Sequence, residues 1–143
     1  MKKENLVAVL FIAILVAVVF LPIYGALVYR FTAYDTYYSH GFLVPLVSLY
    51  LVFRKRKTLK AIEPKPYLAG LFIFTSGLVL HVISLALKVR VTSYLSIPVV
   101  MLGIVLFLGG KKFARELLFP IGFLIFGLPL PKVLIIGIAF KLK

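Results

Sequence analysis

Long stretches without a charged side chain, separated by short basic clusters, are the feature that most constrains how this chain folds. The first stretch, residues 6–29, is 24 residues long, and about 20 apolar residues suffice for a helix to cross the hydrocarbon core of a bilayer. A secretory signal peptide has a shorter apolar region, about 7–15 residues, followed by a small-residue cleavage site. We therefore interpret residues 6–29 as a retained transmembrane helix, kinked by Pro22.

Further apolar runs continue this pattern along the chain. Residues 67–87 and 91–110 are each long enough to span a bilayer, and residues 37–53 are short for a span. A basic turn is predicted at residues 111–116, and the run at 117–130 ends at a Pro-Leu-Pro break. Residues 133–143 look like the start of a further segment. The predicted fold is all-α: a single polytopic bundle of about five membrane segments, truncated at its C-terminus.

Composition agrees with a membrane protein and argues against a nucleic-acid partner. Hydrophobic residues make up 63% of the chain, against about 45–50% in ordinary globular domains. The net charge is +13, but the cations form short clusters between apolar runs, whereas a nucleic-acid binder carries a basic stripe on a soluble domain. The chain has no cysteine, so it contains no disulfide and no cysteine nucleophile. We expect contact with the lipid bilayer and no cofactor.

The distribution of cations between the loops predicts the orientation in the membrane. Eleven cations fall on one side of the predicted spans: Lys2, Lys3, Arg54, Lys55, Arg56, Lys57, Lys60, Lys65, Lys111, Lys112 and Arg115. Three fall on the other, namely Arg30, Lys88 and Arg90. Because cytoplasmic loops are enriched in Lys and Arg, we predict a multi-pass protein of the cell membrane with a cytoplasmic N-terminus.

Small residues recur at seven-residue spacing in two neighbouring predicted helices. Residues 67–87 carry Gly70, Gly77 and Ser84, with His81 on the same face, and residues 91–110 carry Ser96, Gly103 and Gly110. Small side chains at such spacing let helix backbones approach closely in lipid. We predict that these two faces pack against each other.

Few residues suggest a self-contained catalytic or metal site. His81 lies about 9 Å inside the outer end of its helix, at 1.5 Å per residue, and a metal site of His81, Asp35 and His40 is one interpretation. No two of these ligands share the tight spacing typical of zinc motifs, so we predict no metal and a hydrogen-bonded histidine between helices. Ser39 beside His40 does not make a triad, because adjacent turn residues rarely point at each other.

Two blocks of sequence resemble one known family. Residues 35–47, Asp-Thr-Tyr-Tyr-Ser-His-Gly-Phe-Leu-Val-Pro-Leu-Val, followed by Arg54-Lys55-Arg56, are similar to the N-terminal signature of the exosortase/archaeosortase family. The run Leu-Phe-Pro-Ile-Gly-Phe-Leu-Ile-Phe-Gly-Leu-Pro-Leu-Pro at residues 118–131 resembles a later block of the same family. The resemblance covers essentially the whole chain, but only the first half of the family's membrane domain.

The resemblance implies a membrane cysteine protease or transpeptidase. Members of this family process C-terminal sorting tails that consist of a short motif, a transmembrane helix and a basic cluster. The Cys, Arg and His of the family act in helices beyond the second block, so the resemblance implies that this chain lacks the catalytic residues. The predicted orientation puts Asp35, Tyr38 and His40 in an outer loop, and our hypothesis is that this loop lies on the substrate side, near the cleavage site.

Two other classes remain open at this point. The chain is alternatively a small non-enzymatic membrane protein, such as a subunit or assembly factor held by helix packing. A small transporter is a third possibility, weakened by the lack of charge within the predicted helices.

Overall fold

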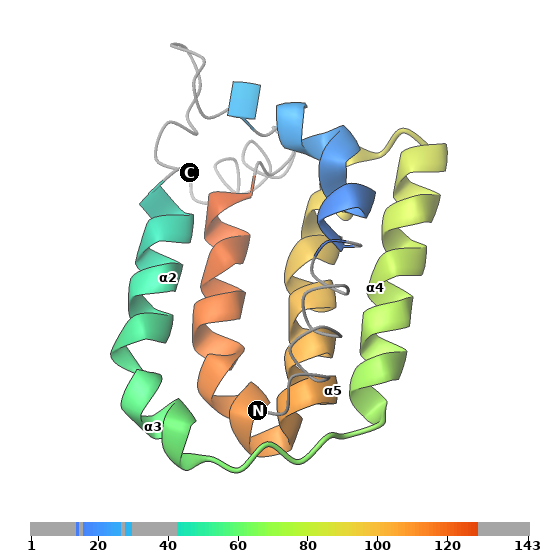
Figure 1. Cartoon of the computed structure of the whole chain (residues 1–143). Helices are drawn as coiled ribbons and strands as arrows, with labels where there is room; N and C mark the ends of the chain where they lie inside the picture. The colour runs from blue at the N-terminus through green and yellow to red at the C-terminus, as the bar shows by residue number, and fades with distance from the viewer. Residues whose placement is uncertain (1–13, 15, 27, 30–42, 129–143) are drawn as a thin grey trace, which may run out of the picture.

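The computed structural model describes residues 14, 16–26, 28–29 and 43–128, and all of its regular structure is helical. An apolar helix, Val16–Ala26, is followed by α2 (Leu43–Arg54), α3 (Arg56–Ala61), α4 (Ala69–Ala86), α5 (Arg90–Phe123) and the 3₁₀ helix η2 (Leu124–Gly127). Figure 1 shows α2, α4 and the two parts of α5 standing side by side, with α3 turning away at the foot of α2. This confirms the all-α class.

The helix α5 is a hairpin of two arms, because its path reverses at Gly110. That residue has φ 82° and ψ −176°, far from helical values, and Figure 1 shows the arms before and after it running in opposite directions. The linker between α3 and α4 lies against this reversal, with the Lys65 N–H donating to the Gly109 carbonyl at 3.3 Å. The prediction of a basic turn at residues 111–116 is wrong, since these residues form the first turns of the second arm.

The longest helix–helix contact joins α4 to the first arm of α5, and small residues make it close. The buried residues of α4 are Gly70, Gly77, His81 and Ser84, and those of α5 include Ser96, Gly103 and Gly110. A Cβ atom placed on Gly70 would lie 2.6 Å from the Phe107 Cα, and one on Gly103 would lie 2.6 Å from the Phe74 Cα. Backbone meets backbone at both positions, so only glycine fits.

Replacing Gly103 by alanine should destabilise the protein, whereas the same change at Gly122 should not. The Gly103 methyl would collide with the backbone of α4, and overpacking of this kind costs about 1–3 kcal/mol. A methyl group on Gly122 would meet nothing within 4 Å, so its replacement gains helix propensity, up to about 1 kcal/mol. Thermal unfolding of both variants in detergent measures the difference. Equal midpoints would mean that α4 and α5 are not in contact at Gly103.

Prolines inside α5 leave backbone carbonyls free, and α2 together with Lys55, the residue that follows it, supplies donors to this region. Pro120 has no N–H, so the carbonyl of Glu116, four residues earlier, lacks its intrahelical donor. The Lys55 ammonium donates to that carbonyl at 2.8 Å and also to the Glu116 carboxylate at 2.9 Å. About two turns earlier along α2, the Ser48 hydroxyl donates to the Pro120 carbonyl at 2.8 Å. These bonds join α2 to the second arm at two separate points.

On α4 the exposed surface is more apolar than the buried face. On α4 the exposed side chains include Phe72, Val79 and Val82 at 56–71% exposure, while the buried residues are two glycines, a histidine and a serine. A soluble fold buries its large apolar side chains, and a patch of this kind marks an interaction surface or lipid. The inverted distribution is what a bilayer stabilises.

The described residues contain two helices that are long and apolar enough to cross a membrane, Ala69–Ala86 and Arg90–Gly127, and the second of these holds both arms of α5. The predicted span at 37–53 overlaps α2, whose described part is Leu43–Arg54, while residues 37–42 lie outside the described residues. The predicted span at 117–130 is in part the second arm and η2. The expected further segment at 133–143 lies outside the described residues.

Candidate functional site

A cluster of polar side chains is buried where α4, the first arm of α5 and the helix Val16–Ala26 meet. Its centre is His81, whose side chain is fully buried at 0% exposure. The Nε2 atom lies 3.0 Å from the carbonyl oxygen of Val19, and Nδ1 lies 2.9 Å from the hydroxyl of Ser93. The ring packs on Phe20, with 4.1 Å between centroids. One side chain thus joins three helices.

The partners of His81 indicate its tautomer. A carbonyl only accepts hydrogen bonds, so Nε2 carries the proton and donates to Val19, and Nδ1 accepts from Ser93. The Ser96 hydroxyl donates to the Ser93 carbonyl at 2.6 Å, which leaves its 3.4 Å approach to Nδ1 a weak contact. Both ring nitrogens are occupied by bonds within the chain. This arrangement satisfies a buried polar residue in an apolar layer.

A second polar pair continues the cluster toward the α4–α5 turn. The Ser84 hydroxyl lies 2.8 Å from the Thr92 Oγ1 and 2.5 Å from the Leu80 carbonyl. The Thr92 hydroxyl in turn donates to the Val89 carbonyl at 3.1 Å. Neither Thr92 nor Ser93 was predicted from the sequence. Both lie near the start of a predicted span, where Ser and Thr hydroxyl groups often donate hydrogen bonds to nearby backbone carbonyls.

A hollow of about 280 Å³ opens beside this cluster, at the end of the bundle where α4 passes into α5. It is lined by the hydroxyl-bearing Ser84 and Ser93, by the apolar Ile23, and by the cations Lys88 and Arg90. Nearby, the side chain of Tyr94 is 1% exposed, and its hydroxyl has no hydrogen-bond partner among the described residues. This end of the bundle therefore combines hydroxyl groups with positive charge.

The three outer-loop residues predicted on the substrate side, Asp35, Tyr38 and His40, lie outside the described residues. Within the described residues no group of three or more His, Asp or Glu side chains is placed to hold a metal ion. The chemistry that the described part of the chain offers is hydrogen bonding and positive charge.

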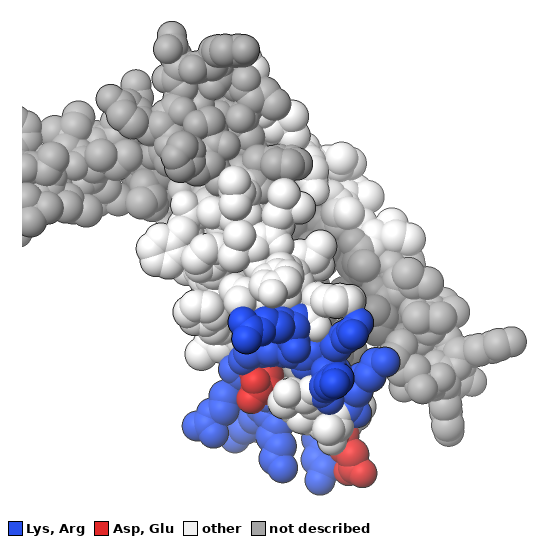
Figure 2. Space-filling model, turned by 90° about the vertical axis from the view of Figure 1, so that its left-hand side faces the viewer, with Lys and Arg blue, Asp and Glu red and all other residues white. Residues whose placement is uncertain are grey.

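The opposite end of the bundle carries most of the charge. Figure 2 shows Lys and Arg side chains gathered at the foot of the molecule, below an uncharged body. They belong to α3, the end of α2, the α3–α4 linker and the start of the second arm of α5: Arg54, Lys55, Arg56, Lys57, Lys60, Lys65, Lys111, Lys112 and Arg115. We call this set the basic end. Lys88 and Arg90 are the cations of the described residues at the other end.

The described helices include two that are apolar and of membrane-spanning length. Large apolar side chains lie on the surface, and cations are concentrated at one end. These features are typical of an α-helical membrane protein. The sequence model of the transmembrane exosortases (Exosortase_EpsH) matches residues 31–143. The chain therefore belongs to this family, as its two sequence blocks predict. No curated protein and no solved structure was found to match it.

Proposed function

We propose that this chain is the N-terminal membrane part of an exosortase-like cysteine protease or transpeptidase that processes the C-terminal sorting signals of exported proteins. The observation that carries the proposal is the family match over residues 31–143. The chain has no cysteine, so the nucleophile comes from a part of the complete protein outside these 143 residues. The test is whether a sorting tail is cleaved only when that part is present.

The role we propose for the described helices is to hold one side of the membrane path of the substrate helix. Exposed apolar side chains of α2, among them Leu46, Leu49 and Phe53, offer a surface to a second apolar helix. On its other side, α2 is fixed by its Ser48 and Lys55 bonds to the second arm of α5. A rigid wall of this kind orients a bound helix without itself reacting.

The proposed cleavage site lies at the end of the bundle away from the basic end. His40 precedes Leu43 by three residues, so the chain keeps it within about 10 Å of the first turn of α2. That turn lies at the same end as the α4–α5 turn (Figure 1), where Ser84, Lys88 and Arg90 line their hollow. Asp35, Tyr38 and His40 are proposed to shape the mouth of the site from this end.

The orientation that this proposal requires puts the basic end in the cytoplasm and the α4–α5 turn outside. Thr58 in α3 and Val89 beside α5 are both exposed and uncharged, so a single cysteine at either position leaves every cation in place. In intact cells a membrane-impermeant thiol reagent should label Val89→Cys and not Thr58→Cys. Both should react after the cells are opened. Labelling of Thr58→Cys alone in intact cells would reverse the orientation.

A second candidate is a non-enzymatic membrane subunit or assembly factor. The lack of any cysteine in 143 residues favours it, because a family built on thiol chemistry is represented here by a chain without a thiol. In that case the chain would bind a sorting tail, or a partner protein, through α2 and leave it intact.

A further inference from the structure

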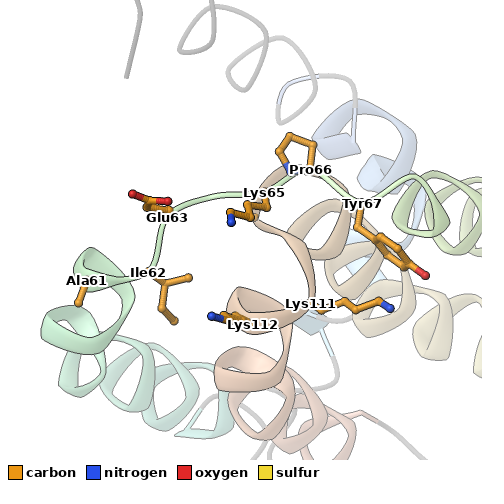
Figure 3. Close-up of a pocket in the computed structure, with 9 residues that line it drawn as sticks. Ala61, Ile62, Glu63, Lys65, Pro66, Tyr67, Lys111 and Lys112 are labelled. Carbon is orange, nitrogen blue, oxygen red and sulfur yellow. The ribbon is translucent and has the colours of Figure 1, made fainter.

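A hollow of about 610 Å³ lies at the basic end, between the α3–α4 linker and the reversal of α5 at Gly110. In Figure 3 the linker arches over this space, and the side chains of Lys65 and Lys112 extend into it from opposite walls. The Glu63 carboxylate is turned away from the space in the same view. Two ammonium groups therefore face the hollow, whereas the nearby carboxylate does not.

The two lysines have no carboxylate partner within the described residues. The one ion pair found there joins Lys55 and Glu116 at 2.9 Å. Lys111, the third cation at this hollow, places its ammonium 4.3 Å from the centre of the Tyr67 ring. Lys65 and Lys112 are therefore free to bind an anion.

The backbone adds positive potential at the same place. Because Gly110 leaves the helical conformation, the second arm begins at Lys111 with N–H groups that have no carbonyl one turn earlier. The start of a helix attracts anions, phosphate above all. Gly109, Lys111 and Lys112 all line the hollow, so this helix start and the two free lysines belong to one site.

The position of the hollow along the helices indicates which kind of anion it binds. Tyr67 stands two residues before α4, and Gly109 lies at the end of the first arm of α5, so the hollow lies at the ends of two apolar helices. If these helices span the bilayer, their ends lie at its edge. Lipid headgroups lie at this level, and Tyr rings are enriched there. Basic pockets between membrane helices on the cytoplasmic side suit the phosphate of an anionic lipid.

We propose that this hollow binds the phosphate group of an anionic phospholipid, held by Lys65, Lys112 and the start of the second arm of α5. The ammonium groups contact the phosphate oxygens, and the N–H groups that follow Gly110 donate to them. The Tyr67 ring, beneath Lys111, lies against the glycerol region. The bound lipid adds a further link between the linker and the hinge of α5, beside their backbone hydrogen bonds and the Lys111–Tyr67 contact.

The test measures binding of phosphatidylglycerol to the full chain in detergent by native mass spectrometry. Lys65→Gln with Lys112→Gln should weaken binding about 30-fold, since each basic residue near an anionic lipid contributes about fivefold. The matched control is Arg54→Gln with Lys57→Gln, which removes the same charge from the basic end without touching the hollow. It should weaken binding by no more than about threefold, because exposed charges away from the headgroup are screened.

Two results would overturn the proposal. Equal losses in the two double variants would mean that the whole basic end attracts anionic lipid without a defined site. The second result concerns the unchanged chain in phosphatidylcholine nanodiscs. If inorganic phosphate stabilises it as strongly as phosphatidylglycerol does, the hollow binds a soluble phosphate. Thermal unfolding measured with each addition separates the two sources. A selective loss in the first double variant, without any effect of inorganic phosphate, supports the lipid.

Discussion

The 143-residue chain is expected to leave a sorting-signal substrate uncut when both are reconstituted in the same vesicles. In cysteine chemistry the thiolate attacks the scissile carbonyl, and this chain has no thiol. Adding one at random does not help, because a nucleophile needs a base and an oriented substrate beside it. The variant Thr58→Cys, with its thiol at the basic end, should be as inactive as the unchanged chain.

Two substitutions should lower cleavage activity by very different amounts. In the longer protein that the proposed function requires, replacing the proposed nucleophilic cysteine by alanine should lower cleavage by several orders of magnitude, as loss of a nucleophile does in other proteases. His40→Ala should lower turnover by no more than about 100-fold, the size of effect that misplacing a substrate produces. The measurement is release of the tail from a tagged substrate over time. Cleavage by the purified 143-residue chain, free of the complete protein, would disprove the proposed mechanism.

Replacing Gly110 by alanine should unfold or severely destabilise the bundle. With φ 82° and ψ −176°, Gly110 occupies a backbone region that is essentially reserved for glycine, and strain of this kind costs about 1–3 kcal/mol. The methyl group would also lie 3.0 Å from the Lys65 carbonyl carbon and closer still to its oxygen. Both effects act on the backbone, which has no side-chain rotation to relieve them. We expect a total loss of about 3 kcal/mol or more.

The neighbouring glycine supplies the control. A methyl group on Gly109 would meet the Phe113 side chain at 2.7 Å and no left-handed strain, because its φ is not positive. The Phe113 Cβ and Cγ would have to move, and overpacking of this kind costs about 1–3 kcal/mol. Gly109→Ala should therefore lose stability, but less than Gly110→Ala, which adds the backbone strain. Thermal unfolding in detergent ranks the two variants. Similar midpoints would place the reversal of α5 at another residue.

The helical class follows from the sequence, but the reversal of α5 does not. Long uncharged runs predict membrane helices whatever their partners, because the bilayer requires internal hydrogen bonds. The basic run after Gly110 is typical of a loop, yet Lys, Arg, Ala, Glu and Leu are good helix formers. They continue as helix here, and the whole change of direction falls on a single glycine. The 3₁₀ helix η2 and the short helix α3 were not predicted, because elements this short contain too few residues to show a hydrophobic periodicity.

The candidate site was likewise only partly predictable from the sequence. His81 stands out in the sequence as a polar residue within an apolar run, whereas its partners do not. Its bond to Val19 uses a backbone carbonyl, which no side-chain pattern reveals. Ser93 is one of several hydroxyl residues at the start of a span, and only the packing of α4 against α5 selects it. Likewise, the bond from Lys55 to the Glu116 carbonyl depends on Pro120 sitting one turn further along.

The bond between His81 and Ser93 also bears on how the protein is made. An imidazole that enters lipid without a partner is costly, and Ser93 follows His81 by only 12 residues. The turn between α4 and α5 is short, with Lys88 in a left-handed conformation at φ 56°. We therefore expect the serine to reach the histidine soon after both helices have left the ribosome. The expected unit of insertion is the bonded pair of α4 and the first arm of α5, and not a single helix.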